Sequence, residues 1–126
     1  MAQLVFDAFG EDDEFLCELG RLLLAACKFE AALHQYAIKH SKKAVQEKAT
    51  LGRLLETIRN STYLACTLDE GMTFAIQQRN YFVHNLSRRL SGYTTDDFNL
   101  QQFKNRLRGL SFDLAFFTQL VTRENA

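Results

Sequence analysis

The chain contains no proline among its 126 residues. Proline ends or kinks most helices that contain it, and it is common in the turns of all-β folds. Its absence favours long, uninterrupted helices. Hydrophobic residues make up 47% of the chain and charged residues 24%, a composition that supports a packed core. At this length we expect one domain covering residues 1–126.

The charges balance overall but are unevenly distributed. Lysine and arginine together number 15, as do aspartate and glutamate, which excludes a uniformly basic, charge-driven nucleic-acid binder. Residues 1–30 carry a net charge of −5 and the remainder carries +5. We interpret the acidic run at residues 11–14 as the solvated first turn of a helix, where carboxylates face the positive end of the dipole. A local cationic site in the later part of the chain stays open.

The three cysteines, Cys17, Cys27 and Cys66, include no C-x-x-C pair. This spacing fits neither a disulfide framework nor a zinc site, so we expect reduced, partly buried thiols and no metal. No apolar run approaches the roughly 18 residues that span a membrane, and the N-terminus lacks a signal-peptide pattern. We therefore expect a cytoplasmic protein without membrane association.

Apolar periodicity predicts four helices. The first runs from Asp12 to His40, and its recurring apolar residues are Leu16, Leu19, Leu23, Ala26, Leu33 and Ala37. Thr50 is expected to cap the second, which ends near Asn60 and Ser61. One face of this second helix consists of Leu51, Leu54, Leu55 and Ile58.

The third helix is predicted to open with a capping box at Thr67–Glu70 and to run to about Leu90, with Gly92 as its stop. The fourth is predicted from about Asp96 to Thr122. Its apolar positions are Phe103, Leu107, Leu110, Leu114 and either Phe117 or Leu120. Four helices with short links predict an all-α, up-and-down four-helix bundle.

The third helix carries the most distinctive segment, residues 77–85. Familiar cofactor, phosphate-binding and protease motifs are absent, and His34 and His40 have no third ligand nearby, so no cofactor is expected. At 100° per residue the third helix has one polar stripe and one apolar stripe. The polar stripe contains Thr73, Gln77, Asn80, His84, Ser87, Arg88 and Ser91, and the apolar stripe contains Met72, Ala75, Ile76, Val83, Leu86 and Leu90.

Arg79 lies in the middle of that apolar stripe. A buried guanidinium needs a partner because its charge would otherwise be left unsolvated. Glu30, on the apolar side of the first helix, is the expected partner, and Glu56 is the alternative. Periodicity alone favours an ion pair between Glu30 and Arg79 that holds the helices in register.

The segment Arg79-Asn80-Tyr81-Phe82-Val83-His84 resembles the R-N-x-x-x-H form of the signature of the HEPN superfamily (higher eukaryotes and prokaryotes nucleotide-binding). The stretch Thr50-Leu51-Gly52-Arg53-Leu54 resembles the T-L-G-x-L sequence that often opens the second helix in that superfamily. At residue level the resemblance covers about six positions. In its expected four-helix architecture the resemblance covers the whole chain.

The resemblance implies an α-helical HEPN-like domain, usually a homodimer, many of whose members are metal-independent endoribonucleases of toxin–antitoxin or phage-defence systems. Arg79 and His84 would be the catalytic pair and Asn80 the supporting residue. RNA would be the substrate, and an antitoxin or other protein a possible partner. Members silenced by nucleotide modification carry a tyrosine where this chain has Leu86, so adenylylation there is not supported.

These residue types suit RNA cleavage without metal. Histidine titrates near neutral pH and can take the proton of a ribose 2′-hydroxyl, while guanidinium binds phosphate through two hydrogen bonds. Asn80 precedes His84 by one turn and would hold its imidazole. Arg79 and His84 are separated by roughly 140° around a regular helix, so their convergence requires an arginine that reaches round, an irregular helix, or a cleft shared by two copies of the third helix.

Binding of RNA would need a local basic surface. Arg88 and Arg89 follow His84, and Lys104, Arg106 and Arg108 form a second basic group. Tyr81 and Phe82 are candidates for stacking on a base, although aromatic residues in helices more often pack in the core. Two functions remain in competition. The first is an endoribonuclease that uses Arg79, Asn80 and His84 at the interface of a homodimer and leaves a 2′,3′-cyclic phosphate and a 5′-hydroxyl. The second is a non-catalytic HEPN-like module that binds a protein partner or a nucleotide.

Overall fold

The computed structural model describes residues 5–40, 45, 49–61, 66–90 and 99–124, and the side chains of these except at 5, 6, 61, 83–90 and 124. Every secondary-structure element among the described residues is an α-helix. The helices are α1 (Val5–Gly10), α2 (Asp13–His40), α3 (Leu51–Ser61), α4 (Cys66–Leu90) and α5 (Leu100–Glu124). Four of them correspond to the predicted helices, and α1 was not predicted.

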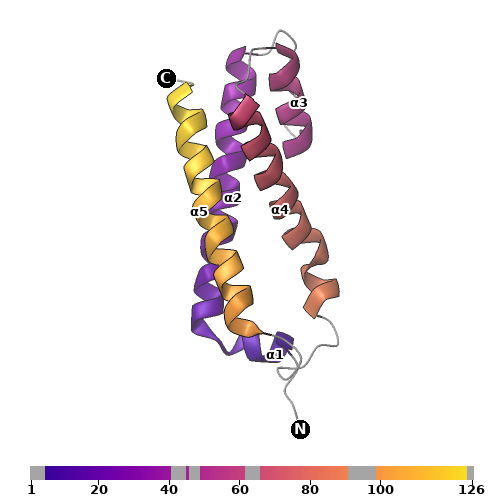
Figure 1. Ribbon diagram of the computed structural model, residues 1–126, viewed down its shortest axis with the longest axis vertical. Helices are drawn as coiled ribbons and strands as arrows, with labels where there is room; N and C mark the ends of the chain where they lie inside the picture. Colours follow the sequence, from indigo (N-terminus) through magenta and orange to yellow (C-terminus); the bar gives the residue numbers. More distant parts are fainter. Residues whose placement is uncertain (1–4, 41–44, 46–48, 62–65, 91–98, 125–126) are drawn as a thin grey trace.

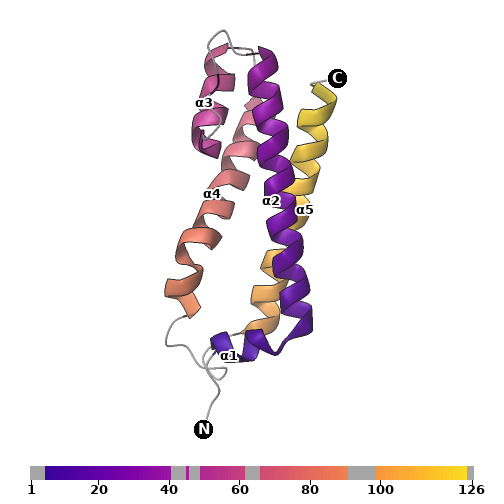
Figure 2. The same cartoon turned by 180° about the vertical axis from the view of Figure 1, so that it is seen from behind.

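Three long helices, α2, α4 and α5, extend along the long axis of the molecule (Figure 1). The shorter α3 lies beside α2 and the first part of α4, and α1 lies at the opposite end of the bundle (Figures 1 and 2). Following the chain, α2 and α5 run in the same direction and α4 runs in the opposite one. The predicted up-and-down order is therefore wrong for α2 and α5, because in that order the first and last helices are antiparallel.

Side-chain caps mark three helix starts. The backbone N–H of Phe15 donates to Asp12 Oδ1 at 3.0 Å, that of Arg53 donates to Thr50 Oγ1 at 3.2 Å, and that of Gln102 donates to Asn99 Oδ1 at 2.9 Å. The predicted cap at Thr50 is confirmed, and each cap satisfies one N–H that the helix leaves open.

Two predicted helix starts differ from the structure. Helix α4 begins at Cys66, so Thr67 lies inside its first turn, and Glu70 Oε1 accepts a hydrogen bond from Cys66 Sγ at 3.3 Å. The capping box is therefore not formed. Helix α5 begins at Leu100 behind the Asn99 cap, whereas the predicted start at Thr95–Asp97, like the Gly92 stop, lies outside the described residues.

The core is one apolar cluster to which all five helices contribute. Predicted faces on α3 and α5 are confirmed: the buried residues are Leu51, Leu54, Leu55, Ile58, Phe103, Leu107, Leu110 and Leu114. At the end where α1 lies, Phe9 stacks on Phe15 with ring centroids 3.7 Å apart, and Phe103 packs against Phe9 at 5.5 Å. The unpredicted α1 thus closes the core at this end.

The apolar face predicted for α2 is only partly correct. Leu33 and Ala37 are buried, but Leu16 and Leu23 are 46% and 56% exposed. The side that faces the core instead carries Phe15, Glu18, Leu22, Phe29, Leu33, Tyr36 and Ala37. Helix α2 therefore has apolar residues on two opposite sides, and periodicity alone did not distinguish them.

All three cysteines are exposed, so the expectation of partly buried thiols is wrong. Among the described helices, none is both long and apolar enough to cross a membrane.

Candidate functional site

Helix α4 presents different residues to its two neighbours. Met72, Ala75 and Ile76 are buried in the core, which confirms the described part of the predicted apolar stripe; Val83, Leu86 and Leu90 have side chains outside the described set. A polar side turned toward α3 begins with Asp69 and Thr73.

A clamp of hydrogen bonds joins this polar side to the end of α3. Arg59 donates to Asp69 from Nε, at 2.8 Å to Oδ1 and 2.9 Å to Oδ2, and from Nη2 to Thr73 Oγ1. The Arg59 guanidinium lowers the pKa of the Asp69 carboxyl, and the carboxylate in turn raises the pKa of Arg59. The clamp joins the last turn of α3 to the first two turns of α4.

The same side of α4 continues beyond α3 to the candidate site. At helical spacing, Thr73, Gln77, Asn80 and His84 follow one another along it, and α4 is a continuous α-helix throughout. Helix α3 lies beside only the first part of α4 (Figures 1 and 2). The site residues therefore begin where the cover from α3 stops.

Arg79 and Asn80 are held together by a direct hydrogen bond. Arg79 Nη1 donates to Asn80 Oδ1 at 3.0 Å, and both residues are half-buried. Arg79 Nε is buried and has no hydrogen-bond partner among the described residues. The guanidinium is thus paired with the neighbouring amide, and among the described residues its Nε is an unused donor.

The predicted ion pair between Glu30 and Arg79 is not formed. Both side chains are described, and the ion pairs found among the described residues do not join them. The Asn80 carbonyl is a neighbour in sequence and accepts the guanidinium bond without bringing a second charge out of water. The alternative partner, Glu56, is exposed on α3.

Tyr81 lies on the side of α4 that borders α5. It is 38% exposed and meets Phe82 edge-on, with ring centroids 6.1 Å apart, while Phe82 packs on Phe103 at 5.7 Å. A groove of about 410 Å³ separates the two helices here. Its lining residues are Phe74, Gln78, Tyr81, Phe82, Arg106, Leu110 and Asp113. Tyr81 is thus available at the surface, and Phe82 belongs to the packing.

The remaining predicted site residues are only partly described. His84, Arg88 and Arg89 lie within α4, but their side chains are outside the described set. Their approach to Arg79 and Asn80 therefore stays a prediction based on helical spacing.

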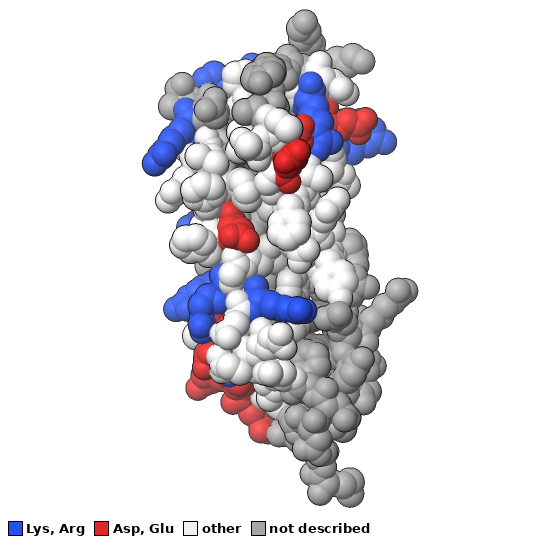
Figure 3. Space-filling model, in the orientation of Figure 1, with Lys and Arg blue, Asp and Glu red and all other residues white. Residues whose placement is uncertain are grey.

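The second predicted basic group is mostly neutralised. Lys104 Nζ donates to Asp12 Oδ2 at 3.0 Å, and Arg108 donates to Glu18 Oε1 at 3.1 Å and to Glu14 Oε1 at 3.2 Å. Arg21 also binds Glu18 at 3.1 Å. Acidic and basic side chains adjoin each other at this end of the molecule (Figure 3).

These ion pairs were missed by sequence reasoning, which treated the acidic run as solvated. A signal was present, because Glu14 and Glu18 are four residues apart, as are Lys104 and Arg108, and each pair occupies one helix face. Matching the two faces required knowing that α2 and α5 lie side by side in parallel. Arg106 is exposed and borders the groove beside Tyr81.

No group of three or more histidine, cysteine, aspartate or glutamate side chains that could hold a metal ion occurs within the described part of the chain. The fold and the site thus define an all-helical protein with an Arg–Asn pair on its fourth helix. Comparison with protein-family models, curated proteins and solved structures finds no match for this chain.

Proposed function

We propose that the protein is a metal-independent endoribonuclease with an HEPN-like helical bundle, in which Arg79, Asn80 and His84 form the catalytic group. The observation that carries the proposal is the hydrogen bond from Arg79 Nη1 to Asn80 Oδ1 at 3.0 Å. It supports the proposal because it joins the guanidinium to Asn80, which precedes His84 by one turn of α4.

The bond joins Arg79 to Asn80 within one chain, and the complete site, with His84, is proposed to lie at the interface of the homodimer. An irregular helix is not required, since α4 is continuous from Cys66 to Leu90, and a second copy is not required to bring Arg79 beside Asn80. Arg79 Nε is a buried donor without a partner among the described residues, so the guanidinium keeps hydrogen-bonding capacity that its bond to Asn80 does not use.

The proposed reaction is an internal transfer at phosphorus. His84 takes the proton of the ribose 2′-hydroxyl, the 2′-oxygen forms a bond to phosphorus, and the bond from phosphorus to the 5′-oxygen breaks. Arg79 stabilises the charge on the non-bridging oxygens, and the departing 5′-oxygen takes up a proton. The products are a 2′,3′-cyclic phosphate and a 5′-hydroxyl.

Tyr81 is proposed to stack on a base, and Arg88 and Arg89 to bind flanking phosphates. Toxin–antitoxin or phage defence is the proposed setting, with a cytoplasmic homodimer as the active species and an antitoxin or other protein as regulator. Neutralisation of Lys104 and Arg108 leaves Arg106 as the exposed cation beside Tyr81 in the groove between α4 and α5.

The test is cleavage of single-stranded RNA in the presence of EDTA by the wild type and by His84→Ala. We expect the substitution to lower the rate by about 10²–10⁴-fold, because it removes the general base. Arg53→Ala, an exposed arginine on α3, is the control and should cleave normally. An RNA with 2′-deoxyribose at the cleavage position should resist the wild type, since it has no attacking hydroxyl.

Retention of full activity by His84→Ala, or cleavage of the 2′-deoxy substrate, would contradict the mechanism. Circular dichroism and thermal unfolding of each variant show whether a loss of rate reflects a loss of fold.

A non-catalytic HEPN-like module that binds a protein or nucleotide is the second candidate. The observation in its favour is that Arg79 has an internal partner and is half-buried, as a structural residue would be. If purified protein cleaves no RNA and His84→Ala behaves like the wild type in every assay, this candidate is supported instead.

A further inference from the structure

Two exposed aromatic side chains border the same groove on α4. Phe74 is 57% exposed and Tyr81 is 38% exposed, and both line the groove of about 410 Å³ between α4 and α5. They are seven residues apart, so they lie within about 20° of each other around α4 and about 10.5 Å apart along its axis. The groove therefore has two aromatic rings on one wall, two helical turns apart.

Polar side chains lie between and opposite these rings. Gln78 lies between them on α4, and Arg106 and Asp113 line the groove from α5. Arg106 and Asp113 are exposed, and neither takes part in the ion pairs found among the described residues. The groove thus offers an amide, a cation and a carboxylate to a ligand.

The two charges are ordered along the groove. Helices α4 and α5 run in opposite directions (Figure 1), and the contact between Phe82 and Phe103 at 5.7 Å sets their register. Arg106, three residues after that contact, therefore lies towards the Tyr81 end of the groove, and Asp113, seven residues further along α5, lies towards the other end. A phosphate is attracted to the Tyr81 end and repelled from the opposite end.

This combination matches the chemistry of single-stranded nucleic acid. Aromatic rings stack on bases, amides and carboxylates bind base edges, and guanidinium binds phosphate. The spacing fits two bases, because layers stacked 3.4 Å apart place two bases between rings that are about 10.2 Å apart. Since the charges of the lining residues cancel, the groove has no net attraction for an acidic protein surface.

We propose that the groove between α4 and α5 binds two consecutive bases of single-stranded RNA, one against Phe74 and one against Tyr81, with Arg106 on a phosphate. This site rests on the proposed function, in which RNA is the substrate, and it adds Phe74, Arg106 and a track for two bases. His84 follows Tyr81 by three residues on α4, so the strand leaves the groove towards the proposed catalytic group. The cleaved bond then lies next to the two bound bases.

Binding is measured apart from cleavage by using a strand that cannot be cleaved. A hexamer of 2′-O-methyl adenylate keeps the bases and phosphates but has no free 2′-hydroxyl. We expect the wild type to bind it, and Phe74→Ala to raise Kd by about 5–100-fold, the loss typical of one stacked base. Tyr81→Ala should have a similar effect. Phe74 is more than half exposed, so its replacement should leave the fold intact.

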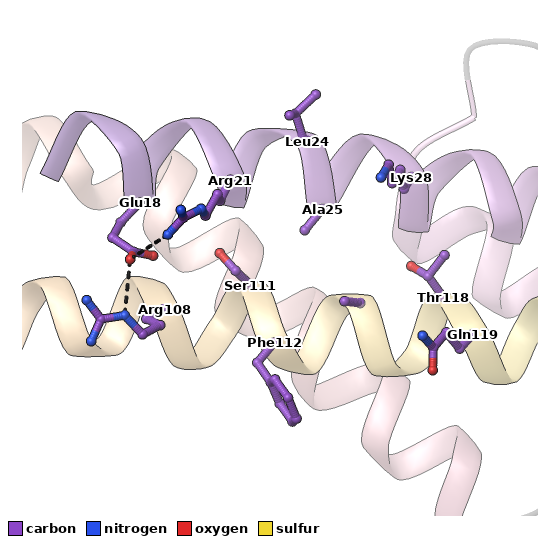
Figure 4. Close-up of a pocket in the computed structure, with 11 residues that line it drawn as sticks. Glu18, Arg21, Leu24, Ala25, Lys28, Arg108, Ser111, Phe112, Thr118 and Gln119 are labelled. Atoms are coloured by element: carbon purple, nitrogen blue, oxygen red, sulfur yellow. Dashed lines mark hydrogen bonds and ion pairs between the residues drawn. The ribbon is translucent and has the colours of Figure 1, made fainter. Parts of the chain in front are cut away.

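Phe112→Ala is the matched control. Phe112 is 74% exposed on α5, but it borders the groove between α2 and α5 (Figure 4) and not the one that Phe74 and Tyr81 line. Its removal takes away an exposed ring from the other side of α5 and should leave Kd unchanged. An equal loss of affinity in Phe112→Ala and Phe74→Ala would overturn the proposal, because it would show that any exposed ring binds the strand.

The salt dependence of binding tests Arg106. Each phosphate neutralised on a single strand contributes about −0.7 to the slope of log K against log salt. Arg106→Gln should therefore make the slope shallower by about 0.7, whereas Phe74→Ala should weaken binding without changing the slope. A wild-type slope in Arg106→Gln would contradict the assigned phosphate contact.

These measurements distinguish a failure of the groove from a failure of the proposed function. Weaker binding by Phe74→Ala, with normal binding by Phe112→Ala, supports the groove even if the wild type cleaves no RNA. If RNA is cleaved, Phe74→Ala should raise KM and leave kcat nearly unchanged, because stacking binds substrate and transition state alike. A wild type that does not bind the hexamer, or wild-type Kd and KM in both Phe74→Ala and Tyr81→Ala, would overturn the groove whatever the result with His84→Ala.

Discussion

Asp12 and Lys104 join the start of α2 to the second turn of α5 through a hydrogen bond of 3.0 Å between Oδ2 and Nζ. The same carboxylate caps α2 by accepting the N–H of Phe15 at Oδ1. One side chain thus stabilises a helix terminus and the parallel pairing of two helices. The cap, followed by the bond to Lys104, lowers the pKa of the Asp12 carboxyl.

Substitution of Asp12 should therefore separate these two contributions. Asp12→Ala loses both the cap and the partner of Lys104, whereas Asp12→Asn keeps a capping oxygen and loses the charge. We expect the urea midpoint to fall in the order wild type, Asn, Ala. Asp13→Ala, an exposed neighbour on the same turn, should change it little. Equal midpoints for Asp12→Ala and Asp13→Ala would show that the cap on α2 and the bond to Lys104 contribute nothing to stability.

Stability should decrease in acid. Asp12 and Asp69 both have a pKa below the ordinary value of 3.8 in the folded protein, so their contribution is complete above that value and is lost as the pH falls through the lowered pKa. The Lys104 pKa is raised above 10.5, so its contribution is complete below 10.5 and is lost in stronger alkali. The free energy of unfolding, measured with urea across the pH range, should form a plateau between these limits. Its decrease in acid should be less steep for Asp12→Asn.

Gly71 and Gly109 should respond differently to alanine. A Cβ at Gly71 would lie 2.5 Å from Cζ of Phe117, whereas nothing lies within 4 Å of one at Gly109. Gly109→Ala should gain about 0.5–1 kcal/mol in free energy of unfolding, because alanine is the better helix former. Gly71→Ala has to displace the Phe117 ring, and overpacking typically costs about 1–3 kcal/mol. Chemical denaturation of both variants measures the difference, and equal effects would show that the ring moves freely.

Variants of Asn80 test whether this residue serves Arg79 alone. Asn80→Ala removes the acceptor of the half-buried guanidinium and should lower the free energy of unfolding by about 1–3 kcal/mol. Asn80→Asp keeps an acceptor for Arg79 but has no amide donor. If Asn80 also orients His84, RNA cleavage should be reduced in Asn80→Asp while stability is retained. Full cleavage by a stable Asn80→Asp protein would limit the role of Asn80 to holding Arg79.

Much of the helical architecture was predictable from local features. The absence of proline and the spacing of apolar residues predicted four of the five helices, and Thr50 marked one start. On α3 and α5 the buried face is the one with the regular apolar spacing, so their core residues followed directly from periodicity. Helix caps and apolar spacing depend only on residues that are close in sequence, so they can be predicted without knowledge of the tertiary structure.

Three features were decided by the tertiary structure. Helix α2 has two apolar sides, and only its packing shows that Phe29 faces the core while Leu23 faces outward. The partners of Glu18 and Lys104 depend on the parallel placement of α2 and α5. Arg79 binds Asn80 rather than Glu30. Residues distant in sequence come into contact only through the packing of whole helices. That packing depends on the apolar surface buried over the entire bundle and not on any single segment.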